Sequence, residues 1–395
     1  MMAQVDRHHF HFFGNREVNS LALTLALFHF GEGLLNVFVP IYFWTLGFPL
    51  WKIIFFFFLN SLFFVILTPA ILRFIVGLSD KIMMFLSVPF LAVYYLGLNY
   101  IVVLPWLFYV LPAFLALNML FFNVGYNMDF AKSADEGDVG KEVGQRYMIG
   151  SLVQFSAPFI GGTLIALTGF GHTFVLGITV LFLAFIPLFF FPQRKLLGNL
   201  NNKSIWGFLR GAEMKNFNIS AVGYATETMV DRLVWPLFIF LTVGSVQNFG
   251  GVISLGWLLS GLVTFLVGYL SDSGRRKKVL RIMTNIFSLS WVFRAFAVEL
   301  PTVVGSHILG NTAHASLVVA WTSQYYKLAR KVDDASAFIL SREILYNLVR
   351  IVFLPILMAL AYFLSMEMFF RISLLFAALL TMLFVFANNA ELTEN

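Results

Sequence analysis

Long apolar stretches alternate with short polar linkers along almost the whole chain. A helix that spans a membrane needs about 20 mainly apolar residues, and we count twelve such segments. They lie near residues 18–46, 51–74, 81–99, 101–128, 144–168, 172–192, 217–243, 248–270, 279–298, 302–326, 335–364 and 367–387. The pattern predicts an all-α integral membrane protein with twelve transmembrane helices, of which the longest tilt or extend beyond the bilayer.

Basic residues gather in every second linker between these segments. The clusters lie at Arg7–Arg16, Arg73–Lys81, Lys132–Arg146, Arg194–Lys215, Arg275–Arg281 and Lys327–Arg342. The other linkers contain few cations, with Lys52 as the main exception. Because positive loops stay on the cytoplasmic side, we expect both termini to be cytoplasmic and the protein to lie in the plasma or inner membrane. The even number of spans agrees with this orientation.

The composition supports a membrane protein and excludes several other classes. Only 12% of the residues are charged and the mean hydropathy is +0.84, whereas soluble proteins carry about 25% charged residues. The chain has no cysteine, so disulfides and cysteine zinc sites are excluded. The net charge of +6 comes from linkers beside the spans, which indicates membrane topology rather than nucleic-acid binding. The His-rich segment at His8, His9 and His11 is a weak metal candidate, and we predict no metal and no cofactor.

Two halves of six spans resemble each other in the order of their features. The first feature is a segment that runs from a Glu through an inner Pro to a Gly, found at Glu32–Gly47 and at Glu227–Gly244. The second is a Gly-Asp segment, found at Val76–Lys81 and at Val267–Lys278. The third is an Arg that precedes a Pro, found at Arg146 with Pro158 and at Arg342 with Pro355. Internal repeats of this kind are common in transporters. We therefore predict a tail at 1–17, a six-helix bundle at 18–193, a linker with an amphipathic segment at 194–216, a second bundle at 217–388 and a tail at 389–395.

The segment Gly268–Leu280, GYLSDSGRRKKVL, resembles the loop signature of the major facilitator superfamily, G-x-L-x-D-x-x-G-R-K/R-K/R. It matches at Gly268, Leu270, Asp272, Arg275, Arg276 and Lys277, and the second Gly falls one position early, at Gly274. The copy in the first half is reduced to Gly77, Asp80 and Lys81. The resemblance implies two six-helix bundles related by a pseudo-two-fold axis. It also implies alternating access by rocking of the bundles about a central site.

A second segment, Gly144–Gly162 in span five, resembles the antiporter signature of drug-exporting members, G-x8-G-x3-G-P-x2-G-G. It matches at Gly144, Pro158, Gly161 and Gly162, and it departs at Val153 and Ala157. Small residues permit close helix packing, so Pro158, Gly161 and Gly162 are expected at a helix contact. The match favours export only slightly.

The resemblance also implies a cytoplasmic gate that bridges the two bundles. Asp272 with Arg146 is one expected pair, and Asp80 with Arg342 is its pseudo-symmetric counterpart. Gly268 and Arg275 belong to the same gate through the loop signature. The alternative is that these cations only determine the membrane topology.

Ionisable residues inside the spans are the strongest functional candidates, because charges in a membrane interior are costly. Glu32 lies near the middle of span one, with His29 on the same helix face. Glu227 lies near the middle of span seven, followed by Asp231 and Arg232. We predict proton coupling at Glu32 first, at Glu227 second and at Asp231 third. The alternative is a neutral or paired carboxylate, with Asp231 neutralised by Arg232.

Other polar residues in the spans are candidates for contacts in the central cavity. Arg350, near the middle of span eleven, could bind an anionic substrate or balance Glu32 or Glu227, and Arg294 in span nine could extend outward to the membrane surface. The remaining candidates, which could equally hold helices together, are Asn60, Asn118, Gln154, Asn311 and His314.

These features favour a secondary transporter that moves a small molecule with protons. The sequence shows neither an ATP-binding P-loop nor an enzyme motif, so we predict no enzyme activity. The expected partners are a small-molecule substrate, protons and the lipid bilayer, and the protein is expected to be a monomer. The alternatives are a sensor or partner module of the same fold that does not transport, and a proton-coupled importer of an anionic metabolite.

Overall fold

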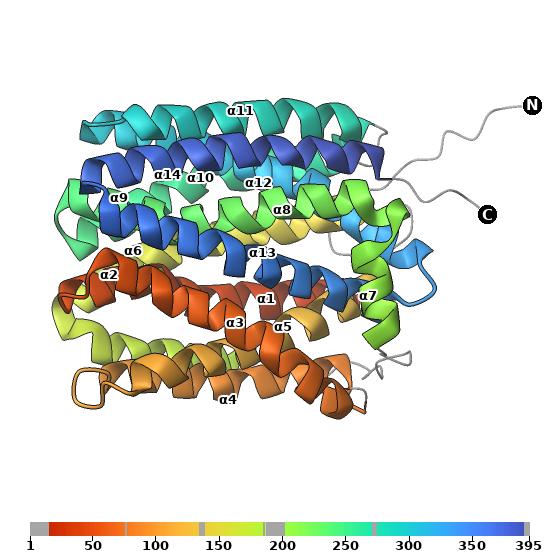
Figure 1. The fold of residues 1–395 in the computed structure, drawn as a ribbon, viewed down its shortest axis with the longest axis horizontal. Coiled ribbons are helices and arrows are strands. Elements are labelled where there is room, and N and C mark those ends of the chain that lie inside the picture. Colours follow the sequence, from red (N-terminus) through yellow and green to blue (C-terminus); the bar gives the residue numbers. More distant parts are fainter. Residues whose placement is uncertain are drawn as a thin grey trace, which may run out of the picture.

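The computed structural model describes residues 16–75, 77–133, 139–184, 186, 202–270 and 275–390. All elements in this part of the chain are helical. The spans are formed by α1 (Arg16–Gly33), η1 (Asn36–Phe38), α2 (Val39–Thr45), α3 (Leu50–Ile75), α4 (Asp80–Asn99), α5 (Leu107–Ser133), α6 (Val139–Leu183), α8 (Lys215–Met229), η4 (Val230–Val234), α9 (Trp235–Val243), α10 (Val246–Leu270), α11 (Arg276–Phe296), α12 (Leu300–Lys331), α13 (Ala335–Phe363), α14 (Met366–Thr381) and η6 (Met382–Asn389). They lie side by side with their axes along the length of the molecule (Figure 1).

The helices correspond to the twelve predicted spans. Seven of the described helical segments are long and apolar enough to cross a membrane by length and composition alone. One of them, Glu142–Leu183, has 42 residues and contains predicted spans five and six. The chain reverses between these two spans at Gly169, whose φ of 82° lies in the left-handed region that glycine favours. The other four predicted spans correspond to α8–η4–α9, α10, α11 and α12.

Spans one and seven are both interrupted before a proline, at corresponding places in the two halves. In span one, η1 separates α1 from α2, and Pro40 lies in the first turn of α2. In span seven, the π-helical turn η4 separates α8 from α9, and Pro236 lies in the first turn of α9. Proline removes a backbone donor and clashes with the carbonyl four residues earlier, so it favours a break at this point.

The two ends of the bundle are distinguished by the chain segments that they hold. The amphipathic helix α7 (Asn202–Arg210) and the turn η3 (Ala212–Met214) lie in the predicted linker and mark one end, which we call the α7 end (Figure 1). The end of η6 lies there too, because Asn216 Nδ2 donates to the Asn389 carbonyl at 3.1 Å. The turns after α2 and α9 lie at the other end, which we call the far end. There Gly47 and Gly244 adopt positive φ angles of 80° and 72°.

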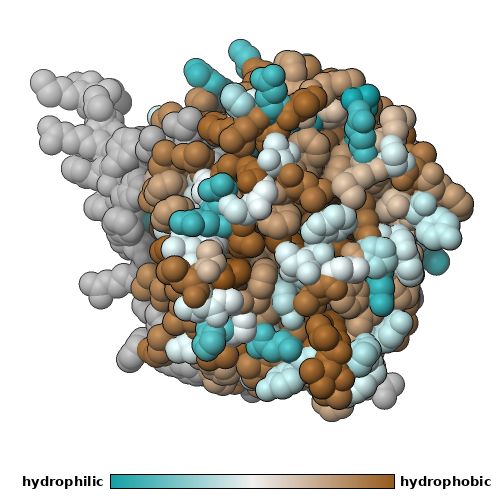
Figure 2. Space-filling model, turned by 90° about the vertical axis from the view of Figure 1, so that its left-hand side faces the viewer, coloured by the Kyte–Doolittle hydropathy of each residue, from teal (hydrophilic) through white to brown (hydrophobic). Residues whose placement is uncertain are grey.

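The surface of the described part of the chain is rich in exposed apolar side chains. Exposed examples on the sides of the bundle include Ile66, Leu96, Leu167, Leu266 and Val352. Figure 2 looks onto the far end, where polar side chains are scattered among apolar ones. Apolar flanks suit contact with lipid tails, and the chain is a multi-pass membrane protein.

Candidate functional site

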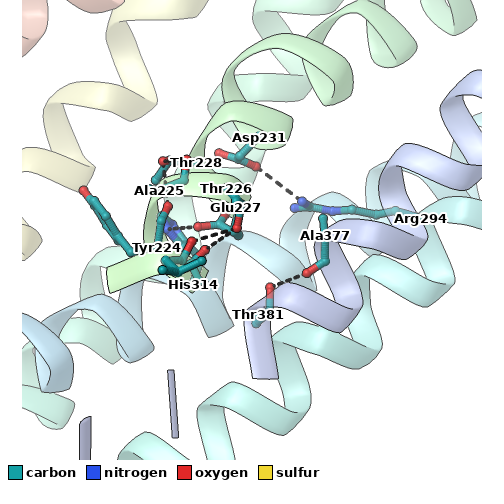
Figure 3. Close-up of polar contacts among 12 residues, drawn as sticks. Tyr224, Ala225, Thr226, Glu227, Thr228, Asp231, Arg294, His314, Ala377 and Thr381 are labelled. Atoms are coloured by element: carbon teal, nitrogen blue, oxygen red, sulfur yellow. Dashed lines mark hydrogen bonds and ion pairs between the residues drawn. The ribbon is translucent and has the colours of Figure 1, made fainter. Parts of the chain in front are cut away.

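Glu227 and His314 meet inside the second half of the bundle. Glu227 lies in α8, about 18 Å from the start of this helix at 1.5 Å per residue, and His314 lies in α12. The Glu227 Oε2 atom is 3.6 Å from His314 Nε2, and Figure 3 shows the two side chains pointing toward each other. The Glu227 side chain is fully buried. Neither of its oxygens has a hydrogen-bond partner among the described residues.

One turn farther along the span, Asp231 pairs with Arg294. Asp231 lies in the π-helical turn η4, and its Oδ1 accepts a hydrogen bond of 3.4 Å from Arg294 Nη1 (Figure 3). The Arg294 side chain has no exposed surface. Its guanidinium lies 4.6 Å from the ring centre of Trp235 and 4.3 Å from that of Trp291. Two indole rings and a carboxylate therefore hold this charge inside the bundle.

Two sequence interpretations are wrong at this point. Arg294 does not extend outward from span nine, because its whole side chain is buried between helices. Asp231 is not neutralised by its neighbour Arg232, since its ion pair is with Arg294 on α11. The sequence did mark Arg294 as a functional candidate, because it is a charged residue inside a predicted span. The sequence does not show which way that side chain points.

Beside this cluster, a hydrogen-bonded pair links α9 to α12. Trp235 Nε1 donates to His307 Nδ1 at 3.0 Å, and His307 Nε2 lies 3.4 Å from the Ile253 carbonyl. Both rings are buried. Since the indole donates to Nδ1, this nitrogen is the acceptor and His307 is neutral. Sequence reasoning missed this pair.

Two arginines of the predicted cavity have no carboxylate partner. Arg350 in α13 is buried, and its Nη2 donates to the Thr228 hydroxyl at 3.3 Å. Arg232 in η4 is exposed. Within the described part of the chain, no carboxylate oxygen lies within ion-pair distance of either guanidinium. Arg350 therefore does not balance Glu32 or Glu227 in this structure.

Glu32 and His29 lie together in the first half, as their spacing predicts. The two residues are three apart on α1, and Glu32 Oε2 is 3.5 Å from His29 Nδ1. Both side chains are partly exposed, Glu32 by 23% and His29 by 31%. The Glu32 side chain is thus partly exposed, whereas that of Glu227 is fully buried.

Contacts between the two halves at the α7 end centre on Tyr326 of α12. Arg146 Nη1 of α6 donates to the Tyr326 hydroxyl at 2.9 Å, and this hydroxyl donates to Asn127 Oδ1 of α5 at 2.7 Å. The Arg146 guanidinium also lies 4.5 Å from the ring centre of Tyr126. Its predicted partner Asp272 lies outside the described residues. Arg146 therefore bridges the halves through a tyrosine that sequence reasoning did not identify.

The second predicted gate pair is replaced by a different one. Arg342 Nη2 binds the neighbouring Glu343 Oε1 at 2.8 Å instead of Asp80, and its guanidinium lies 3.5 Å from the Tyr325 ring centre. Glu343 in turn accepts a hydrogen bond of 3.2 Å from Asn123 in the first half. The prediction of an Asp80–Arg342 pair is thus wrong in this conformation, because Arg342 faces its own half and Glu343 reaches across.

The other residues of the predicted gate lie around the same end. Asp80 is buried at the start of α4, where its Oδ1 accepts a hydrogen bond from the Lys81 backbone. Gly268 lies near the end of α10, and Arg275 is exposed at the start of α11.

Two of the four amides proposed for the cavity connect neighbouring helices. Asn60 Nδ2 of α3 donates to the Pro112 carbonyl, and Asn118 Nδ2 of α5 donates to the Ser87 carbonyl, both at 3.1 Å. Asn311 is buried against Gly256 of α10, and Gln154 is half-buried in α6. The contacts of Asn60 and Asn118 are those of residues that hold helices together.

The antiporter-like segment lies where the halves meet toward the far end. A Cβ atom on Gly162 would lie 2.7 Å from the Val246 carbonyl oxygen, and Gly250 of α10 packs directly on the Pro158 carbonyl. Gly161 packs instead within its own half, against Leu34. The two halves are thus in contact toward both ends of the bundle, with the Glu227 cluster between these contacts.

The structure has the major facilitator fold, and similar solved structures cover the whole described architecture. The fucose:proton symporter FucP of E. coli matches with a TM-score of 0.66 and 13% identity, covering 95% of this chain and 98% of that one. The nucleoside transporter NupG matches with a TM-score of 0.67 and 15% identity, covering 95% of this chain and 98% of that one. A bacterial homologue of the iron transporter ferroportin matches with a TM-score of 0.68 and 15% identity, covering 95% of this chain and 100% of that one. No family model matches the sequence, and no curated protein is similar to it.

Proposed function

We propose that the protein is a proton-coupled secondary transporter that moves a small molecule by alternating access. The carrying observation is Glu227, a fully buried carboxyl group in the middle of a span with no hydrogen-bond partner among the described residues and His314 at 3.6 Å. A buried carboxylate without donors is costly, so the closed site favours the protonated form. When the site opens to water, the charged form becomes accessible and the proton can leave.

The surrounding structure supports such a cycle. Span seven is interrupted at η4 directly after Glu227, and π-helical turns occur frequently at functional sites. The contacts of Tyr326 toward the α7 end and of Gly250 toward the far end would have to break alternately as the halves rock. The basic linkers favour an orientation with the α7 end and both termini in the cytoplasm.

Glu32, the first choice from the sequence, has a different role in this proposal. Its carboxylate is partly exposed and lies beside His29, which suits contact with the substrate or with entering protons. Export stays a prediction of the antiporter-like segment. Within the proposal the protein acts as a monomer in the cell membrane and catalyses no reaction.

A pH-jump experiment tests the coupling without knowledge of the substrate. Purified protein in proteoliposomes on a solid-supported membrane should give a transient current when the external pH changes, because protons bind inside the membrane. We expect Glu227→Gln to abolish this current. Glu299→Gln, a matched change at an exposed residue before α12, should leave it unchanged. A full current in Glu227→Gln would show that the proton binds elsewhere, with Glu32→Gln as the next variant.

A further inference from the structure

We propose that Arg232 and Arg350 form a binding site for an anionic group of the substrate, a carboxylate or a phosphate. This inference rests on the proposed transport function and names the class of molecule that is moved. It starts from the charges in the middle of the spans. Each carboxylate there has a basic neighbour: Glu32 lies beside His29, Glu227 beside His314, and Asp231 beside Arg294. Among the described residues, the guanidinium groups of Arg232 and Arg350 have no carboxylate partner.

Arg350 has the features of a group prepared for a ligand. It is 5% exposed. Among the described residues, its only hydrogen bond is the long one to Thr228, and its Nε has no partner. Tyr346 adds a distant ring contact at 5.9 Å. A buried guanidinium carries five donors, and leaving them unpaired is costly. An anion would satisfy several of them at once.

Arg232 supplies the second charge. It lies in the π-helical turn of span seven, four residues after Thr228, whose hydroxyl accepts the 3.3 Å hydrogen bond from Arg350. Both guanidinium groups therefore lie beside the same stretch of span seven, where their like charges repel each other. No described residue forms an ion pair or a hydrogen bond with it, and its side chain is exposed. Two like charges near each other, one of them buried, destabilise the empty protein and favour an anion between them. Arginine also matches carboxylate and phosphate in geometry through paired hydrogen bonds.

The same arrangement links the anion to the proton at Glu227. This carboxyl group is faced by His314 from α12, by Arg294 from α11, and by Asp231 and Arg232 from its own span. An anion bound at Arg232 cancels part of the positive field at Glu227, so anion binding favours its protonated form. By reciprocity, protonation of Glu227 favours anion binding. Anion and proton would then move in the same direction, which supports the import alternative over export.

Thermal shift of the purified protein in detergent provides the test. Acetate and inorganic phosphate at 50 mM are the probes, each compared with sodium chloride of equal ionic strength, and acetamide is the neutral analogue of acetate. We expect at least one anion to raise the melting temperature of the wild type, since ligands that bind the folded state stabilise it. The larger shift identifies carboxylate or phosphate as the preferred group.

Variants assign the binding to the two arginines. Arg232→Gln and Arg350→Gln should each raise the Kd of the anion by roughly tenfold to hundredfold, and Arg350→Lys should have a smaller effect if Arg350→Gln does not fold. Arg371→Gln, at a partly exposed arginine paired with Glu367, is the matched control and should bind as the wild type does. An anion shift that is absent from the wild type, or unchanged in Arg232→Gln, would overturn the proposal.

A second measurement separates a binding arginine from a structural one. Because Arg232 forms no ion pair or hydrogen bond with a described residue, Arg232→Gln mainly removes the repulsion with Arg350, and it should raise the melting temperature of the protein without anion. A structural role predicts a lower one. In the wild type, a missing anion shift together with a pH-jump current that Glu227→Gln abolishes and the control Arg371→Gln keeps would overturn the anion site alone, so a failed anion site and a failed proton site give different results. Finally, acetate binding should take up protons from weakly buffered solution in the wild type and not in Glu227→Gln.

Discussion

A single methyl group at Gly310 should disrupt the buried ion pair of Arg294. Gly310 lies in α12, and a Cβ atom there would meet Arg294 Nη2 and lie 2.6 Å from its Cζ and 2.9 Å from its Nε. The guanidinium has little freedom to move aside, because Trp235 and Trp291 flank it. Gly310→Ala therefore displaces a fully buried charge from its partners.

The contacts that are lost determine the size of the effect. The long hydrogen bond to Asp231 contributes about 1.5 kcal/mol, and one displaced cation–π contact contributes about 1–2 kcal/mol. Alanine gains up to about 1 kcal/mol over glycine in a helix. We therefore expect Gly310→Ala to lower the free energy of unfolding by about 2 kcal/mol.

Denaturation in mixed micelles, followed by circular dichroism, measures this difference. The matched control is Gly305→Ala in the same helix, where an added Cβ meets no atom within 4 Å. This variant should be as stable as the wild type or more stable. On a background of Arg294→Met with Asp231→Asn, Gly310→Ala should cost nothing, since the clashing group is gone. Equal stability of Gly310→Ala and Gly305→Ala, or an undiminished cost on the double background, would refute the reasoning.

Two further predictions concern the contacts between helices. Gly250→Ala should wedge the halves apart because its Cβ would collide with the Pro158 carbonyl, whereas Gly251→Ala has open space. The chain has no cysteine, so maleimide labelling of a cysteine placed at the buried Ser254 (Ser254→Cys) reports separation of the two halves. Labelling should be faster on the Gly250→Ala background than on the Gly251→Ala background. Equal rates would show that the added methyl group does not separate the halves. Asn118→Ala should lower the free energy of unfolding by about 1 kcal/mol without changing the pH-jump current, and a lost current at unchanged stability would instead assign Asn118 to the cavity.

Hydropathy and proline placement predicted much of the architecture because both act locally. The spans are the stretches that can satisfy every backbone group inside a membrane as helices, so their positions follow from the order of apolar residues. Pro40 and Pro236 interrupt spans one and seven because each removes a backbone donor within its own helix. The His29–Glu32 contact was likewise predictable, since residues three apart on one helix are neighbours. The sequence did not indicate that the break at Pro236 is a π-helical turn.

The partner of each buried charge was decided by tertiary structure alone. Asp231 stands next to Arg232 in the chain but pairs with Arg294, which is 63 residues away on another helix. Arg342 binds Glu343 rather than the pseudo-symmetric Asp80. Which helix faces meet depends on how all twelve spans pack sideways, and no local pattern encodes it. The sequence by itself determined where the charges enter the membrane. The packing decided which ones are neutralised, because an ion pair forms only between atoms that the fold brings within a few ångströms. It left Arg232 and Arg350 without a carboxylate partner among the residues that the structure describes.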